Sequence, residues 1–287
     1  MDRKKRLLGI GVDFNMPEVP VEERIKTIAK VGFDAIFCGT GNGGYVKKVA
    51  TLAKENGLIL QSVHAPFKHV DRMWKEGNEG EDVLAELCLG IDECAENSVG
   101  ILVSHVWIGF VPVEPTELGA ERFLRLFNYA ASRGVTVALE NTEGENHLEY
   151  IRDRFSSHPA FGFCIDTGHE MCYNRSEDMI GKYGAGGKLV ATHLNDNLGV
   201  TGDTITWLDD YHLLPFDGKA DWKNIVSRLD SAGFDGILTF ELKTMSTPGR
   251  TANSIYTGLG CEAYLRLAYE RAEKVASLSC LQIKESV

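Results

Sequence analysis

Short apolar runs alternate with amphipathic stretches along the chain. The apolar runs predict buried strands at residues 7–14, 35–39, 58–64, 100–105, 135–141, 161–167, 189–195 and 236–242. Helical spacing of apolar positions predicts helices at residues 21–31, 43–56, 82–97, 116–133, 147–155, 178–183, 221–232 and 261–278. Strands that alternate with helices imply a parallel sheet. Eight such units predict an α/β fold, a single (β/α)8 TIM barrel that spans residues 1–287 as one domain.

The last six predicted strands all end in a side chain that can bind a metal or move a proton. In chain order these residues are His64, His105, Glu140, Asp166, His193 and Glu241. The carboxyl ends of the strands form the active face of such a barrel. Any one of these residues alone could cap its strand or pair with a lysine. Six in consecutive strands predict one shared site, because buried carboxylates need a cation or a paired charge.

The strand ends of the second half of the barrel supply a mixed set of oxygen and nitrogen ligands. Glu140, Asp166, His193 and Glu241 make up this set. It suits Mn²⁺, Mg²⁺, Co²⁺ or Zn²⁺. Weaker candidates are His169, Asp210 and His212. The last two lie in a long loop, where such residues are usually solvated.

Composition narrows the classes of function. Lys plus Arg number 30 against 41 Asp plus Glu, so the net charge is −11, which argues against binding to a nucleic-acid backbone. The seven cysteines are odd in number and show no C-x-x-C spacing, which predicts free thiols in the reducing cytoplasm. The charged start of the chain, residues 1–6, lacks a following signal-peptide pattern, and no apolar run is long enough to span a membrane.

Two polar loops have more than one interpretation. Residues 39–44 match G-x-G-x-x-G, but the position about 20 residues on, near His64, is not acidic, so a loop that faces the substrate is favoured over a dinucleotide site. Residues 244–258 are rich in Ser and Thr and include Arg250. Barrels often bind phosphate after strand eight, so a phosphosugar site and a merely polar loop both stay open.

Four aromatic side chains fall in loops of the predicted active face. They are Trp74, Trp107, Phe110 and Trp207. They could stack on the face of a sugar or pack the loops against the barrel.

The motifs at five strand ends resemble those of the xylose isomerase-like barrel superfamily, over nearly the whole chain. They are His64-Ala-Pro, Leu139-Glu-Asn141, Asp166-Thr-Gly-His169, His193-Leu-Asn-Asp196 and Phe240-Glu-Leu. The superfamily includes sugar and sugar-phosphate isomerases and epimerases, inositol-catabolism proteins and the DNA-repair enzyme endonuclease IV.

The resemblance to the isomerases and epimerases implies one divalent metal ion, held by Glu140, Asp166, His193 and Glu241. It further implies that Glu140 and Glu241 are catalytic. One removes a proton from the carbon next to the carbonyl, and the other returns it to an enediolate held on the metal. The other five polar residues then face sugar hydroxyls. They are His64, His105, His169, Asp210 and His212.

The resemblance to endonuclease IV implies a different activity for the same nine residues, which match the ligands of three zinc ions. The five residues outside the first metal set would then be additional metal ligands. The net charge of −11 argues against this phosphodiesterase, as do four acidic against three basic residues in the loop 67–81. A barrel that has lost its activity is a third alternative, which the intact glutamate pair disfavours.

We therefore expect a metal-dependent sugar or sugar-phosphate isomerase or epimerase of cytoplasmic carbohydrate metabolism. Its partner is a small sugar, and neither a membrane nor a nucleic acid is expected. A homo-oligomer is allowed by the sequence, which fixes neither the sugar nor the metal.

Overall fold

The computed structural model describes residues 6–111 and 113–281, so the charged residues 1–5 lie outside the described part. Within it, eight parallel strands pair in the order β7-β6-β5-β4-β3-β2-β1-β8. Their bounds are β1 Leu8–Gly11, β2 Ala35–Gly39, β3 Ile59–His64, β4 Ile101–Ser104, β5 Thr136–Glu140, β6 Phe161–Asp166, β7 Leu189–His193 and β8 Leu238–Phe240. The two outer strands also meet, because the Leu194 amide donates to the Thr239 carbonyl over 2.8 Å. The predicted (β/α)8 barrel is confirmed.

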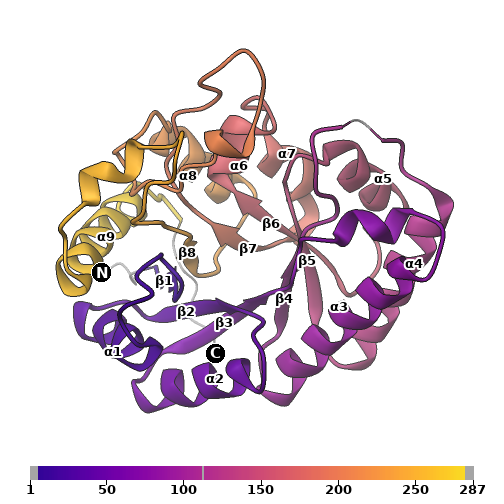
Figure 1. Ribbon diagram of the computed structural model, residues 1–287, viewed down its shortest axis with the longest axis horizontal. Helices are drawn as coiled ribbons and strands as arrows, with labels where there is room; N and C mark the ends of the chain where they lie inside the picture. The colour runs from indigo at the N-terminus through magenta and orange to yellow at the C-terminus, as the bar shows by residue number, and fades with distance from the viewer. Residues whose placement is uncertain (1–5, 112, 282–287) are drawn as a thin grey trace.

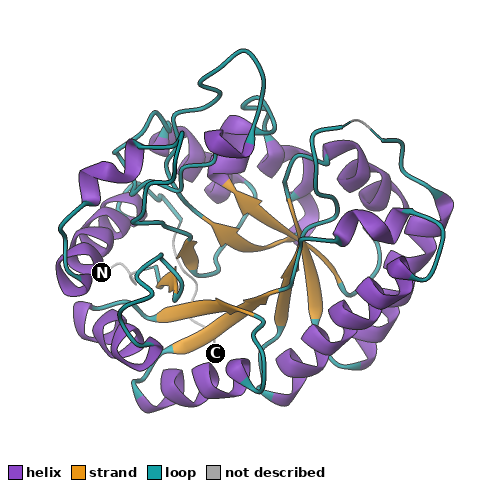
Figure 2. Cartoon of the chain, in the orientation of Figure 1, coloured by secondary structure: helices purple, strands orange, loops and turns teal. Residues whose placement is uncertain are grey.

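Helices surround the strands on all sides (Figures 1 and 2). They are α1 Val21–Val31, α2 Tyr45–Glu55, α3 Glu79–Glu96, α4 Glu117–Ser132, α5 Glu145–Phe155, α6 Thr167–Cys172, α7 Met179–Tyr183, α8 Trp222–Ser231 and α9 Cys261–Ala276. Short 3-10 turns lie at Val70–Trp74, Ala185–Gly187, Trp207–Asp209 and Ala252–Tyr256. The predicted helices are present with ends shifted by a few residues, and α6 is an addition that the apolar pattern did not indicate. That the whole of residues 1–287 forms one domain stays a prediction.

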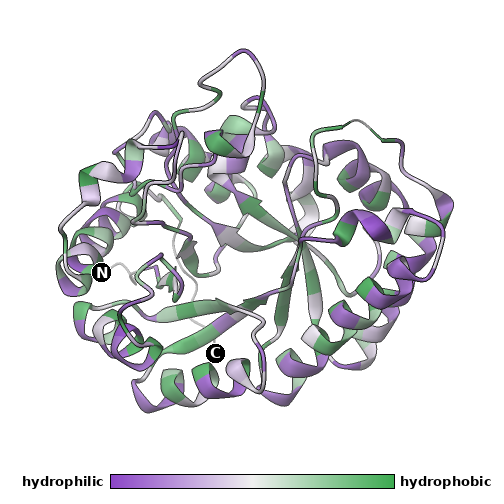
Figure 3. Cartoon of the chain, in the orientation of Figure 1, coloured by the Kyte–Doolittle hydropathy of each residue, from purple (hydrophilic) through white to green (hydrophobic). Residues whose placement is uncertain are grey.

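The barrel interior holds small apolar side chains below its mouth. Val103, Ala138, Cys164 and Ala191 come from four neighbouring strands and are fully buried. Successive side chains of a strand point to opposite faces, so the residue two positions further on also points inward. These residues are His105, Glu140, Asp166 and His193. Apolar positions run along the strands, and polar positions gather on the outer helix faces (Figure 3).

The long loop between β7 and α8 is fixed at its base by Asp196, which is fully buried. One carboxylate oxygen accepts hydrogen bonds from the Phe216 amide and the Trp222 indole, at 2.8 and 3.0 Å. The other accepts one from the Ala220 amide at 2.9 Å. These bonds hold both ends of the loop together, while residues 201–204 at its tip are exposed.

Two of the three loop tryptophans pack the loops against the barrel. Trp74 and Trp107 are buried, and the Trp74 indole donates to the Val106 carbonyl over 2.8 Å. The Trp107 ring stacks on His147 with 4.2 Å between ring centroids. Trp207, by contrast, is 58% exposed. Among the described residues, no helix combines the length and the apolar character needed to cross a membrane.

His147 provides a test of this packing. Its ring is buried between the two tryptophans, and burial lowers its pKa to about 4. An unfolded histidine has a pKa near 6.5, so between about pH 6.5 and pH 4 the unfolded state binds more protons. We expect His147 not to lower the free energy of unfolding above about pH 6.5, where the ring is neutral in both states. The free energy of unfolding should fall by roughly 2 kcal/mol by pH 5 because of this residue, at about 1.4 kcal/mol for each pH unit below about 6.5.

The His147→Gln variant should lose less stability than the wild type between pH 7.5 and pH 5, as measured by urea unfolding. His69→Gln, at an exposed histidine, is the control and should keep the wild-type difference. The same loss in wild type and His147→Gln would contradict the assignment.

Candidate metal centre and active site

The nine predicted site residues lie together at the carboxyl end of the barrel. His64, Glu140, Asp166 and His193 are the last residues of their strands, and His105 and Glu241 directly follow theirs. His169 lies in α6. Asp210 and His212 follow a 3-10 turn in the loop after β7. The barrel thus brings together residues from six strands and two connections.

His193 is the centre of the first group. Its Nδ1 atom lies 3.2 Å from Glu140 Oε1 and 3.2 Å from Glu241 Oε2. Asp166 joins them, and one candidate ligand atom of each residue lies within 4.8 Å of the others. Glu140, Asp166 and His193 are fully buried. Three carboxylates around one imidazole favour a divalent cation, because an isolated buried charge is costly.

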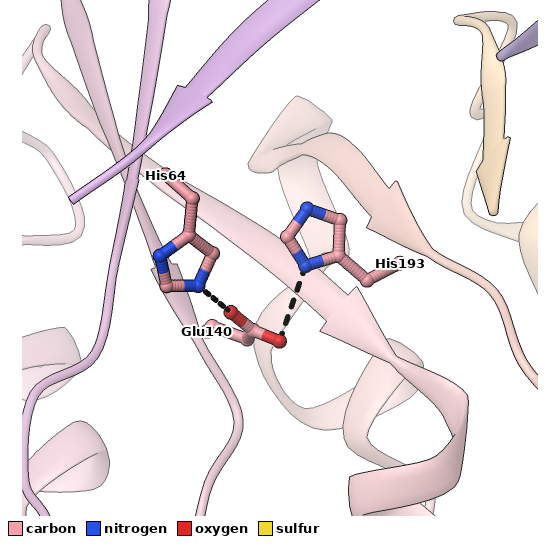
Figure 4. Close-up of side chains that lie close together, drawn as sticks. All are labelled: His64, Glu140 and His193. Atoms are coloured by element: carbon pink, nitrogen blue, oxygen red, sulfur yellow. Dashed lines mark hydrogen bonds and ion pairs between the residues drawn. The ribbon is translucent and has the colours of Figure 1, made fainter. Parts of the chain in front are cut away.

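Glu140 also faces the other side of the barrel mouth. Its Oε2 atom lies 3.1 Å from His64 Nε2 and 3.5 Å from His105 Nε2. Figure 4 shows the carboxylate between the His64 and His193 rings, with one oxygen directed to each. His64, Glu140 and His193 form a second possible ligand group.

A third possible ligand group consists of His169, Asp210 and His212, all buried. His212 Nε2 lies 2.8 Å from Asp210 Oδ2, and His169 Nε2 lies 3.8 Å from Asp210 Oδ1. This Oδ1 atom is buried and has no hydrogen-bond partner among the described residues. His212 adopts a left-handed backbone conformation with a φ of 49°. Such strain in a residue other than glycine is typical of a functional site.

Backbone carbonyls set the orientation of three imidazoles. The Nδ1 atoms of His64, His169 and His212 lie 2.8, 3.0 and 3.2 Å from the carbonyl oxygens of Ala65, Asn141 and Glu241. A proton on each Nδ1 satisfies these carbonyls and leaves Nε2 with a free lone pair that faces a carboxylate. This is the arrangement in which histidine binds a metal.

Asp166 is held by contacts on both of its oxygens. Oδ1 accepts the His169 amide at 2.7 Å and so caps α6. Oδ2 accepts the Asn195 side chain at 2.9 Å. Asn195 fits there because Gly168 has no side chain, since a Cβ atom at that position would lie 2.0 Å from Asn195 Oδ1. Sequence reasoning missed Asn195, although it follows His193 by two positions and so shares its side of the chain.

The charges of the site are mutually dependent. Burial raises the pKa of Glu140, but His193, His105 and His64 outweigh burial and hold this pKa well below its usual range. Burial lowers the pKa of His193, but Cys164 and the two glutamates outweigh burial and hold it well above its usual range. Burial raises the pKa of Asp166. In the absence of a metal, protons on His169 and His193 offset part of the carboxylate charge, and a divalent ion would replace those protons.

Two neighbouring cavities open above these residues. One, of about 350 Å³, is lined by Glu140 and Glu241 of the first ligand group and by the whole third group. The aromatic side chains of Tyr173 and Trp207 and two cations, Lys243 and Arg250, also line it. The other, of about 500 Å³, lies against β1, β2 and β3. His64, Phe67 and Glu241 line both. Gly39 and Thr40 also line the second, so the loop expected to face the substrate does line a cavity.

Comparison with known proteins is consistent with this architecture. The family described as xylose isomerase-like TIM barrel matches residues 25–257. An uncharacterised protein of Sinorhizobium fredii, y4fM, is 28% identical over 246 residues. The match covers 80% of this chain and 73% of that protein.

Solved structures show a similar fold. A xylose isomerase domain containing protein from Salmonella typhimurium LT2 matches with a TM-score of 0.73 and 16% identity, over 96% of this chain and 99% of that chain. D-psicose 3-epimerase from Clostridium cellulolyticum H10, solved with D-tagatose, matches with a TM-score of 0.66 and 17% identity, over 98% and 100% of the two chains. At this level of identity the likeness shows the fold.

Asn195 provides a test of the candidate metal centre. Replacing Asn195 by Ala removes the hydrogen bond that orients Asp166, and losing such an outer contact typically weakens metal affinity by about 10- to 100-fold. We expect this loss in a competition titration of Mn²⁺ or Zn²⁺ against a coloured chelator. Asn197→Ala removes another buried amide, one that bonds the Gly199 amide, and should retain the wild-type affinity. Equal affinities in all three proteins would show that Asn195 does not support a metal ligand.

Proposed function

The chain belongs to the xylose isomerase-like TIM barrel family, and we propose that it is a divalent-metal-dependent isomerase or epimerase of a sugar or sugar phosphate. One observation carries the proposal. Glu140 and Glu241, from strands separated by two others in the barrel, each place a carboxylate oxygen 3.2 Å from His193 Nδ1 at the barrel mouth. The likeness in fold to D-psicose 3-epimerase supports it. The free thiols of the seven cysteines fit a reducing, cytoplasmic setting.

The residues that would hold the ion are Glu140, Asp166, His193 and Glu241. Their oxygen and nitrogen atoms suit Mn²⁺, Mg²⁺, Co²⁺ or Zn²⁺. A bound divalent ion supplies positive charge for a substrate oxygen that becomes negative when the neighbouring carbon loses its proton.

Glu241 is the better placed of the two carboxylates to take that proton. Its Oε2 atom faces His193, whereas no hydrogen bond to Oε1 is formed among the described residues. The side chain is 24% exposed and lines both cavities. A carboxylate oxygen free to approach a substrate carbon is what a general base requires.

Glu140 would deliver a proton to the substrate. Because its carboxylate is ionised, it would first take that proton from solvent in the cavity, and Glu241 would release to solvent the proton that it removed. The Glu140 Oε1 atom faces His193, and the Glu140 Oε2 atom faces His64 and His105. Return to the same carbon from the opposite face gives an epimer, and return to the neighbouring carbon gives an isomer, in both cases through an enediolate of the substrate. His64 and His105 line the cavity and would form hydrogen bonds with sugar hydroxyls.

A phosphodiesterase that cleaves abasic DNA is the second candidate. It is favoured by the third ligand group of His169, Asp210 and His212, which could hold a further ion. Clustered metals stabilise the attacking and leaving oxygens of phosphoryl transfer. The net charge of −11 weighs against attraction of a DNA backbone. Lys243, 3.7 Å from Asp210 Oδ2, already supplies one positive charge to this group.

The glutamate pair provides a test of the chemistry. Changing Glu140 or Glu241 to Gln keeps the shape of the side chain but removes its ability to carry a proton. We expect solvent deuterium exchange into the sugar to fall by roughly 100-fold or more, while some metal binding is retained. The control is Glu262→Gln on α9, because Glu262 forms an exposed ion pair with Lys30. This variant should keep the wild-type rate of exchange. Normal turnover of the substrate by either Gln variant would refute the assigned roles.

The number of bound ions separates the two candidates. We expect about one ion per chain in elemental analysis of protein purified without chelator, and no cleavage of abasic DNA. About three zinc ions per chain together with such cleavage would establish the phosphodiesterase instead.

A further inference from the structure

We propose that Lys243 and Arg250 form an oxyanion subsite in the active-site cavity, so that the substrate carries a phosphate or carboxylate group. The inference rests on the proposed function, because it specifies the class of sugar that this site would accept. It derives from the loop that follows β8, whose residues reach over the candidate metal centre.

The distribution of charge in the cavity is the first observation. Carboxylates line its metal-binding part, where Glu140, Asp210 and Glu241 lie. Lys243 and Arg250 line the part formed by the loop after β8. In a protein with a net charge of −11, two long basic side chains on one wall of a cavity are a local exception. A cation bound by the carboxylates and an anion bound by Lys243 and Arg250 would give both the negative and the positive side chains of the cavity a partner.

The donors of Arg250 are only partly used. Its Nη1 atom donates to the carbonyl oxygens of Asp210 and Trp207. Its Nε atom is buried and has no hydrogen-bond partner among the described residues. No carboxylate of the described chain forms an ion pair with this guanidinium. A buried donor without an acceptor is costly, and a planar guanidinium fits the paired oxygens of a phosphate or carboxylate.

The hydrogen-bond donors of Lys243 are also unused. Its Nζ atom has one ion-pair partner among the described residues, Asp210 Oδ2 at 3.7 Å, which is too long for a hydrogen bond. The side chain is 24% exposed and lines the cavity. Its three donors are therefore available to a ligand.

A hydroxyl group and a tight turn complete the subsite. Thr247 lines the same cavity. The Thr247 and Arg250 backbones exchange two hydrogen bonds, at 2.9 and 2.8 Å. This turn and the carbonyl contacts of Arg250 hold the guanidinium in place, so binding an anion would require little reordering.

Matched substrates test the proposal. We would compare a ketohexose, its 6-phosphate and the corresponding keto-sugar acid as substrates of the full-length, metal-loaded protein, by deuterium exchange. We expect the KM of one anionic sugar to be roughly 10- to 100-fold lower than that of the neutral sugar, since hydrogen bonds to charged groups are the stronger ones. Preference for the phosphate or for the acid identifies the anion. Equal KM values for all three would overturn the subsite.

Lys243→Met is the primary variant, because the Lys243 side chain forms no hydrogen bond among the described residues. It should remove most of the preference for the anionic sugar, so that the KM values of the anionic and neutral sugars become similar. Arg250→Met should act in the same direction. Lys219→Met and Arg266→Met, at residues outside the cavity, are the controls. An unchanged preference in Lys243→Met would count against the subsite.

Inorganic phosphate provides a readout that is independent of catalysis. Calorimetric titration should give a Kd at least about tenfold weaker in Lys243→Met than in the wild type and the two controls. If no sugar undergoes exchange, the proposed function fails, and this titration alone decides the subsite. Weaker binding in Lys243→Met then upholds it, and equal binding in all proteins overturns it.

Discussion

The burial of carboxylates at the mouth of the barrel is the constraint on which the site depends. Glu140 and Asp166 are fully buried, and burial alone would protonate them. The chain keeps Glu140 ionised by placing histidines against both of its oxygens. The same oxygens and nitrogens are metal ligands, so the contacts that stabilise the free protein also preorganise it for a cation.

The barrel geometry makes this arrangement possible at low structural cost. Small side chains such as Ala138 and Ala191 fill the interior one layer below the site. The two-residue period of the strands then directs Glu140 and His193 to the same side, above that layer. Because the apolar layer and the polar layer lie on the same face of each strand, a shift by one residue would turn both towards the helices. The carboxylates would then be buried without their histidine partners.

The sequence predicted those features that depend on this period. The barrel, the strand ends and the grouping of six residues follow from apolar runs that end in His, Glu or Asp. The other three, His169, Asp210 and His212, are weak candidates on their own and join the set through the resemblance to known barrels. Features that depend on the path of loops could not be predicted. The helix α6 begins at a Thr-Gly pair, which has poor helix propensity, and forms because Asp166 caps it. The role of Asn195 and the unsatisfied donors of Arg250 depend on contacts between separate loops, which no local pattern encodes.

Lys243 bears on two questions that the nine site residues leave open, the number of bound ions and the charge of the substrate. A metal ion bound by His169, Asp210 and His212 would lie close to the ammonium of Lys243, because Asp210 attracts both. Two positive charges at such short range repel each other. If Lys243 stays beside Asp210, this group needs no second ion, and the basic side chain remains in the cavity to meet an anionic substrate. If an ion occupies the group instead, Lys243 is displaced towards the cavity and still presents its charge there. In both cases the geometry favours a substrate with a negative group at the wall formed by the loop after β8.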